Sequence, residues 1–91
     1  MDEHVVRDLA VALKAMKDQH GRKLAYDKIQ KKLEGGIGGF AISTGAGVRT
    51  YFDPDTIPGD PNLVNVLGMI EAMGFEIDDL PPAVVSALPS V

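Results

Sequence analysis

The chain has 91 residues, enough for one domain with one hydrophobic core and too few for a catalytic cleft between two lobes. It contains no cysteine, which excludes disulfides and thiolate metal sites and suits a reducing compartment. The net charge is −4, no apolar leader follows Asp2 and Glu3, and no apolar run approaches the roughly 18 residues that span a bilayer, so we expect a cytoplasmic protein without membrane contact.

Charge is distributed unevenly along the chain. Residues 1–34 hold eight of the nine basic residues against six acids, whereas residues 35–91 hold only Arg49 against seven acids. A basic first third can face an anion such as nucleic acid while the acidic remainder faces away from it. Two solvated surfaces without a ligand would show the same pattern, so charge alone leaves both interpretations open.

The first predicted element is a helix that starts at Asp2 and ends near Gln19. Asp2 can cap its free N–H groups, and Gly21 can take the left-handed conformation that ends a helix. Apolar residues recur at three- and four-residue steps and therefore share one face. They are Val6, Leu9, Ala10, Leu13 and Met16.

A second, shorter helix is predicted for residues 24–33, with three lysines on its polar side. Lys28, Lys31 and Lys32 stand at positions i, i+3 and i+4, so they project from one face. Such a face can neutralise phosphates without reading a base sequence. A solvated face paired to Asp27 or Glu34 explains the same spacing.

The next segment, residues 35–47, breaks the helical pattern. It contains six glycines, each of which would cost a regular helix about 1 kcal/mol relative to alanine. One alternative is a short β-hairpin around residues 40–52, with strands at 40–44 and 48–52 joined by a glycine turn. The other alternative is two short helices around a tight glycine turn. The β-branched and aromatic residues slightly favour the hairpin.

Residues 60–75 form the clearest predicted helix. Asp60 can cap it, and Pro61 suits the first helical position, where a missing N–H is harmless. Gly74 ends the helix, and Phe75 is placed to fold back on Ile70 as in a Schellman cap. The predicted apolar stripe consists of Leu63, Val66, Leu67, Ile70 and Met73, widened by Val64 and Met69.

Residues 81–91 form an apolar tail. Its apolar side chains are Val84, Val85, Leu88 and Val91. A terminal segment of this character either docks on its own domain or contacts a partner chain. In the second case, Val84, Val85 and Leu88 are the expected contact residues.

Patterns typical of catalysis or of a cofactor are incomplete. Residues 36–41 fit the loose dinucleotide pattern G-x-G-x-x-A, but a lysine-rich helix precedes them instead of a strand. The aspartates between residues 53 and 60 do not form a calcium loop, because Pro58 stands where such a loop needs glycine. The two histidines have no companions at ligand spacing. We therefore expect no catalytic residue, no metal and no cofactor, and predict that the protein is not an enzyme.

Residues 61–80 read PNLVNVLGMIEAMGFEIDDL. This segment resembles the closing helices of Cro/lambda-repressor-like (Xre-type) helix-turn-helix proteins, which include many antitoxins and typically read PSLxxLxxLxxALGVxLDEL. The identical positions are Pro61, Leu63, Ala72, Gly74, Asp78 and Leu80. Residues 9–33 are similar to the first two helices of that family.

The resemblance implies a recognition helix before Pro61. The family's recognition helix is rich in Ser, Thr, Arg and Gln, and here a longer, glycine-rich segment takes its place. Its counterpart is residues 47–52, where Arg49 and Thr50 would reach bases or phosphates with help from Ser43 and Thr44. The resemblance favours the helical alternative for this segment. If the segment is a hairpin instead, it would act as a wing, or DNA binding would have been lost.

The sequence therefore predicts a mostly α single domain, residues 1–91, built as a small helical bundle of helix-turn-helix type. We expect a DNA-binding transcription regulator that forms a dimer. The predicted DNA contacts are Lys28, Lys31, Lys32, Ser43, Thr44, Arg49 and Thr50. The alternative is a protein-interaction module on the same scaffold, an antitoxin-like or inhibitory partner that does not bind DNA.

Overall fold

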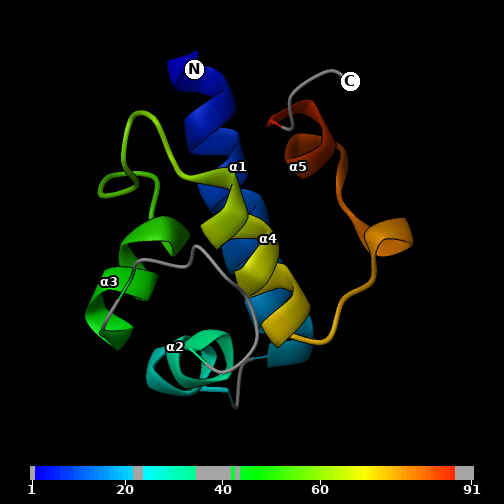
Figure 1. Cartoon of the computed structure of the whole chain (residues 1–91). Coiled ribbons are helices and arrows are strands. Elements are labelled where there is room, and N and C mark those ends of the chain that lie inside the picture. Colours follow the sequence, from blue (N-terminus) through cyan, green and yellow to red (C-terminus); the bar gives the residue numbers. More distant parts are fainter. Residues whose placement is uncertain (1, 22–23, 35–41, 43, 88–91) are drawn as a thin grey trace.

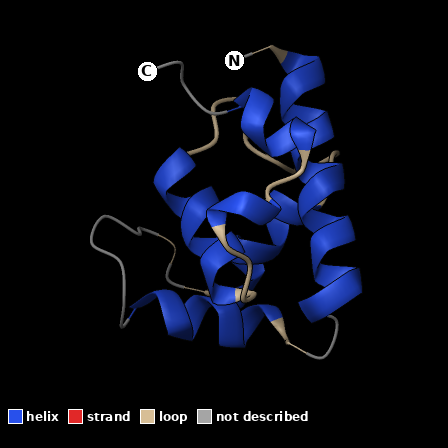
Figure 2. Ribbon diagram, turned by 90° about the vertical axis from the view of Figure 1, so that its right-hand side faces the viewer, coloured by secondary structure: helices blue, strands red, loops and turns tan. Residues whose placement is uncertain are grey.

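The computed structural model describes residues 2–21, 24–34, 42 and 44–87, and its described segments are mostly helical (Figures 1 and 2). The α-helices within them are α1 (Glu3–Met16), α2 (Tyr26–Glu34), α3 (Gly45–Arg49), α4 (Leu63–Ala72) and α5 (Pro82–Ala87). A π-helical turn, Lys17–Gly21, follows α1, and 3-10 turns cover Thr50–Phe52 and Ile77–Asp79. The predicted mostly helical class is therefore confirmed.

Helix α1 begins and buries its side chains as the sequence predicts. The Asp2 carboxylate accepts a hydrogen bond from the His4 N–H at 2.8 Å, which satisfies one of the free amides of the first turn. The buried face contains the five predicted apolar residues. The α-helix ends at Met16 rather than near Gln19, because the chain continues through the π-helical turn, where Lys17 is buried.

The segment after Thr44 is helical. Of the two alternatives left open for residues 48–52, the helical one is therefore confirmed and the hairpin strand was wrong. Thr44 caps α3, since its hydroxyl accepts a hydrogen bond from the Gly47 N–H at 3.1 Å. Val48, Tyr51 and Phe52 are all buried, and their i, i+3, i+4 spacing matches one helical face rather than the alternation of a strand. The strand predicted for residues 40–44 lies largely outside the described residues.

Helix α4 begins two residues later than predicted and has a different cap. The Asn62 side-chain oxygen accepts hydrogen bonds from the N–H groups of Val64 at 2.9 Å and Asn65 at 3.4 Å. Asp60 and Pro61 therefore precede the helix, and the cap predicted at Asp60 was wrong. Asn62 caps the helix instead of Asp60, because its side-chain oxygen reaches two free N–H groups of the first turn.

The C-terminal end of α4 confirms the predicted Schellman cap. Gly74 has a φ of 90°, which glycine adopts without steric cost. Its N–H donates to the Glu71 carbonyl at 2.9 Å, and the Phe75 N–H donates to the Ile70 carbonyl at 3.3 Å. These two bonds satisfy carbonyls that the helix leaves free and turn the chain toward α5.

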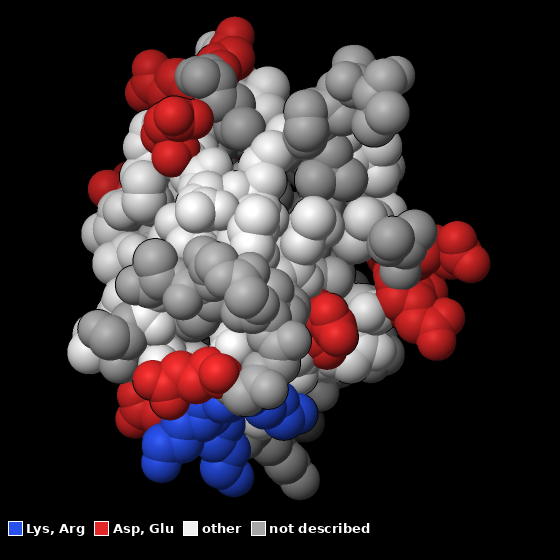
Figure 3. All heavy atoms as spheres, in the orientation of Figure 1, with Lys and Arg blue, Asp and Glu red and all other residues white. Residues whose placement is uncertain are grey.

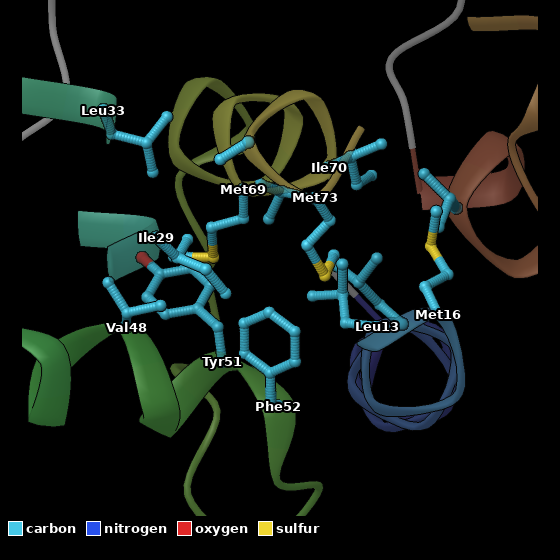
Figure 4. Packing of buried hydrophobic residues seen from close by; sticks show 14 of the residues in the cluster. Leu13, Met16, Ile29, Leu33, Val48, Tyr51, Phe52, Met69, Ile70 and Met73 are labelled. Carbon is cyan, nitrogen blue, oxygen red and sulfur yellow. The ribbon is translucent and has the colours of Figure 1, made fainter. Parts of the chain in front are cut away.

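The core lies where α1, α2, α3 and α4 meet, and side chains from all four helices point into it (Figure 4). The labelled residues are Leu13, Met16, Ile29, Leu33, Val48, Tyr51, Phe52, Met69, Ile70 and Met73. Fully burying one such side chain contributes about 1.5–3 kcal/mol, so the core supplies most of the driving force for folding. The stripe on α4 is rotated from the predicted one, because Val64 and Leu67 are exposed.

Helix α3 approaches α2 closely at Gly45. A Cβ atom at this buried glycine would lie 2.7 Å from the Asp27 backbone nitrogen and closer still to the Asp27 carboxylate. Glycine is therefore needed here for space, since any side chain would push α3 away from the first turn of α2. Farther along, the rings of Tyr26 and Phe52 meet edge to face, with centroids 5.2 Å apart.

The cap of α4 can be tested by mutation. We expect Asn62→Ala to lower the free energy of unfolding by about 1 kcal/mol, because two N–H groups lose their acceptor. The control Asp60→Ala should change it by at most about 0.5 kcal/mol, the usual effect of a surface substitution. Urea unfolding followed by circular dichroism measures both. A larger loss for Asp60→Ala would contradict the cap seen in the structure.

The approach at Gly45 gives a second test. Gly45→Ala should lower the free energy of unfolding by roughly 1–3 kcal/mol, the usual cost of overpacking. The matched control is Gly59→Ala, because a Cβ there meets no atom within 4 Å. That control should leave stability unchanged or raise it by up to about 1 kcal/mol through the unfolded state. Thermal and urea unfolding measure the free energy of unfolding of both variants. An equal change in the two variants would refute the close packing at Gly45.

Candidate nucleic-acid interface

Exposed lysines gather on α2. Lys28 and Lys31 are solvent-exposed and form no hydrogen bond or ion pair with any described residue. In Figure 3, Lys and Arg side chains collect at the end of the molecule formed by α2, with acidic side chains beside them. Other acidic side chains lie at the start of α1 and between α4 and α5. The predicted separation of charge therefore places cations at one end of the visible face.

Lys32, the third predicted phosphate contact, has a contact inside the protein. Its ammonium donates a hydrogen bond to the carbonyl of Ala72, the last residue of α4, at 3.2 Å. A cation at this position satisfies a free carbonyl and faces the negative end of the helix dipole. Lys32 therefore connects α2 to α4, and a phosphate would have to compete with that bond.

Three further predicted DNA contacts, Thr44, Arg49 and Thr50, lie in α3 or directly beside it, and two of them support the backbone. Thr44 caps the helix, and the Thr50 hydroxyl donates to the Gly47 carbonyl at 2.7 Å. The Thr56 hydroxyl in turn donates to the Thr50 carbonyl at 3.0 Å. Arg49 is exposed and makes no hydrogen bond or ion pair with the described residues. Ser43 lies outside the described residues.

A cationic hollow lies where α1, α2 and the end of α3 meet. Its volume is about 440 Å³, and its lining includes Lys14, Lys17, Tyr26, Arg49, Phe52 and Asp53. The ammonium of Lys17 lies 4.6 Å from the centroid of the Tyr26 ring, a cation–π contact. The hollow thus combines three cations, one carboxylate and two aromatic rings.

Lys14 stands at the rim of this hollow and is held by Asp18. The Lys14 ammonium donates to the Asp18 carboxylate at 3.0 Å, one helical turn along the chain. This hydrogen bond is the main cause that raises the pKa of Lys14, while the charge of Arg49 acts in the opposite direction. Lys14 and Arg49 both line this hollow, so their like charges repel each other.

The sequence did not predict that Lys14 and Lys17 belong to a site. Both look like ordinary cations near the C-terminal end of α1, where they complement the helix dipole. Their spacing of i, i+3 indicated a shared face. Together with Arg49, more than 30 residues away in the chain, they line one hollow, and the packing of the helices brings the three residues to it.

The partner contacts predicted on the tail, Val84, Val85 and Leu88, differ in how far they are exposed to solvent. Val84 is fully buried, because α5 packs against α1 in the hydrophobic core. Val84 is therefore a core residue and not an exposed partner contact. Val85 is 54% exposed and remains available. Leu88 lies outside the described residues.

The described residues contain no cluster of His, Asp or Glu that could hold a metal ion. None of the helices in the described segments has the length and apolar character needed to cross a bilayer. Comparison with protein-family models, with curated proteins and with solved structures finds no match.

Proposed function

We propose that the protein is a DNA-binding regulator of the helix-turn-helix type, in which α2 and α3 face the DNA. The observation that carries this proposal is the set of unpaired cations on two adjoining helices. Lys28 and Lys31 on α2 and Arg49 on α3 have no partner among the described residues. Gly45 allows the two helices to pack in close contact, so they would meet a DNA surface as one unit.

Each residue of this surface has a proposed role. Lys28 and Lys31 neutralise backbone phosphates, which supplies affinity independent of base sequence. Arg49 reaches a phosphate or a base edge from α3, since its planar guanidinium suits bidentate contacts. Thr44 and Thr50 fix the backbone of α3 so that Arg49 is presented in one orientation. The resemblance to Xre-type proteins supports the same assignment of α3 as the recognition element.

A homodimer is part of this proposal. Val64 and Leu67 are exposed on α4, one helical turn apart. In the family that the sequence resembles, the corresponding helix supports dimers. Covering these two side chains in a twofold interface would remove apolar surface from water and place two copies of α3 on the same DNA.

The second candidate function is a protein-interaction module, and an apolar groove favours it. The groove runs beside the end of α4 and has a volume of about 370 Å³. Leu67, Ile70, Phe75 and Leu80 form its apolar lining, and two glutamates complete it. This lining suits a partner segment with apolar and basic side chains. Co-purification after nuclease treatment tests this candidate, and loss of every protein partner under that treatment would count against it.

A salt titration tests the proposed DNA-binding function. We expect binding to mixed genomic fragments that weakens steeply with salt, because phosphate contacts release counterions. Removing two contacts with Lys28→Gln and Lys31→Gln should reduce the slope of log K against log salt by about 1.8. Fluorescence anisotropy with labelled fragments measures both quantities. Absence of binding at low salt, where the phosphate contribution is largest, would refute the proposal.

A matched control separates local contacts from total charge. Arg7→Gln also removes one positive charge, but Arg7 lies on α1 and pairs with Asp55 at 3.5 Å. It should leave the slope unchanged. Lys32→Gln should lower the free energy of unfolding, because Lys32 bonds the end of α4. Its effect on the salt slope should be smaller than that of Lys28→Gln. If Arg7→Gln reduces the slope as much as Lys28→Gln, the α2 surface is not the binding face.

A further inference from the structure

Lys17 has a buried stem and no carboxylate partner among the described residues. Only 8% of the residue is exposed, and its ammonium contacts the face of the Tyr26 ring. A lysine can bury its stem while its charged head stays in water, and a cation–π contact adds to this arrangement. No buried side-chain nitrogen in the described residues lacks a hydrogen-bond partner, so the Lys17 ammonium, which makes no hydrogen bond there, is open to solvent. It lines the cationic hollow and can therefore receive an anion.

The other charged groups around the hollow leave an excess of positive charge. Arg49 has no partner in the described part of the chain, and Lys14 is neutralised by Asp18. One oxygen of Asp53, the carboxylate in the lining, accepts a hydrogen bond from the Asp55 N–H at 2.8 Å. With both acids counted against the three cations, one positive charge remains uncompensated.

We propose that the cationic hollow is a binding site for the phosphate group of a ligand, held by Lys17 and Arg49. The guanidinium of Arg49 can donate two parallel hydrogen bonds to phosphate oxygens, and the ammonium of Lys17 supplies a point charge beside them. The Tyr26 and Phe52 rings exclude water from one side, which strengthens both interactions. The volume of about 440 Å³ lies within the range of small-ligand sites, so a phosphorylated small molecule fits.

Two sources can supply this phosphate group, a small phosphorylated molecule or the backbone of a DNA strand. Arg49 links the hollow to the proposed DNA-binding surface, so a strand that crosses α3 would bring a phosphate near it. The site itself does not rest on the proposed DNA binding, since its cations and aromatic rings are present whether or not DNA binds.

A titration of the full chain with inorganic phosphate tests the site. We expect saturable changes in the NMR signals of the Tyr26 and Phe52 rings, compared with sodium chloride at equal ionic strength. Arg49→Gln should raise Kd for phosphate at least about tenfold, because a charge-assisted bidentate contact is lost. Arg49 is exposed, so this variant should keep the native fold. Arg7→Gln, the control of equal charge change, should leave Kd unchanged.

A second variant tests the Lys17 ammonium. Lys17→Met keeps an unbranched stem against Tyr26 and removes the charge, and it should weaken phosphate binding by a similar factor. Its fold is checked by circular dichroism, and Arg49→Gln tests the site if Lys17→Met unfolds. Signal changes that follow ionic strength without saturation would overturn the proposal. An unchanged Kd in Arg49→Gln would overturn it as well.

A DNA duplex then identifies the source of the phosphate. Displacement of bound phosphate by the duplex assigns the hollow to a DNA backbone phosphate. Simultaneous binding of phosphate and duplex assigns it to a small phosphorylated molecule. If the protein binds phosphate but no DNA at low salt, the proposed function fails while the phosphate site stands.

Discussion

The close approach of α3 to α2 at Gly45 is the constraint on which the rest of the site depends. Because Gly45 has no side chain, α3 can start against the backbone of Asp27, and the segment that follows stays in contact with the first turn of α2. Phe52 then meets Tyr26 edge to face, and Val48 enters the core. The same path carries Arg49 to the hollow lined by the lysines of α1. A wider separation of the two helices would remove the ring contact and open the hollow.

Buried polar groups hold this arrangement in place. The Gln30 side chain donates to the Ile42 carbonyl at 3.1 Å and so fixes the chain just before α3. The Asn65 amide donates to the Tyr51 hydroxyl at 3.4 Å and connects α4 to the turn after α3. No buried side-chain nitrogen or oxygen among the described residues lacks a hydrogen-bond partner. Satisfied polar contacts of this kind favour one packing over its alternatives, since a shift would leave a buried group unpaired.

The two proposals share Arg49 and differ in what surrounds it. In the proposed DNA-binding surface, Arg49 acts with the exposed lysines of α2, which are solvated and would bind phosphates through counterion release. On the inner side, Arg49 and Lys17 line the cationic hollow, where the two charges would act on one anion. Arg49 is therefore the residue at which the two proposed sites meet.

The sequence alone determined what depends on neighbours within one or two helical turns: the buried face and cap of α1, the basic face of α2, and the Schellman cap at Gly74. It left residues 48–52 open between strand and helix, because β-branched and aromatic residues suit both until the core shows which spacing is buried. It also placed the cap of α4 at Asp60, since Asp and Asn are both good caps. Only the tertiary structure decided that Val84 is buried, that Lys32 bonds α4, and that Lys17 and Arg49 line one hollow. Those contacts join residues far apart in the chain, and their positions follow from how the helices pack, which local patterns do not encode.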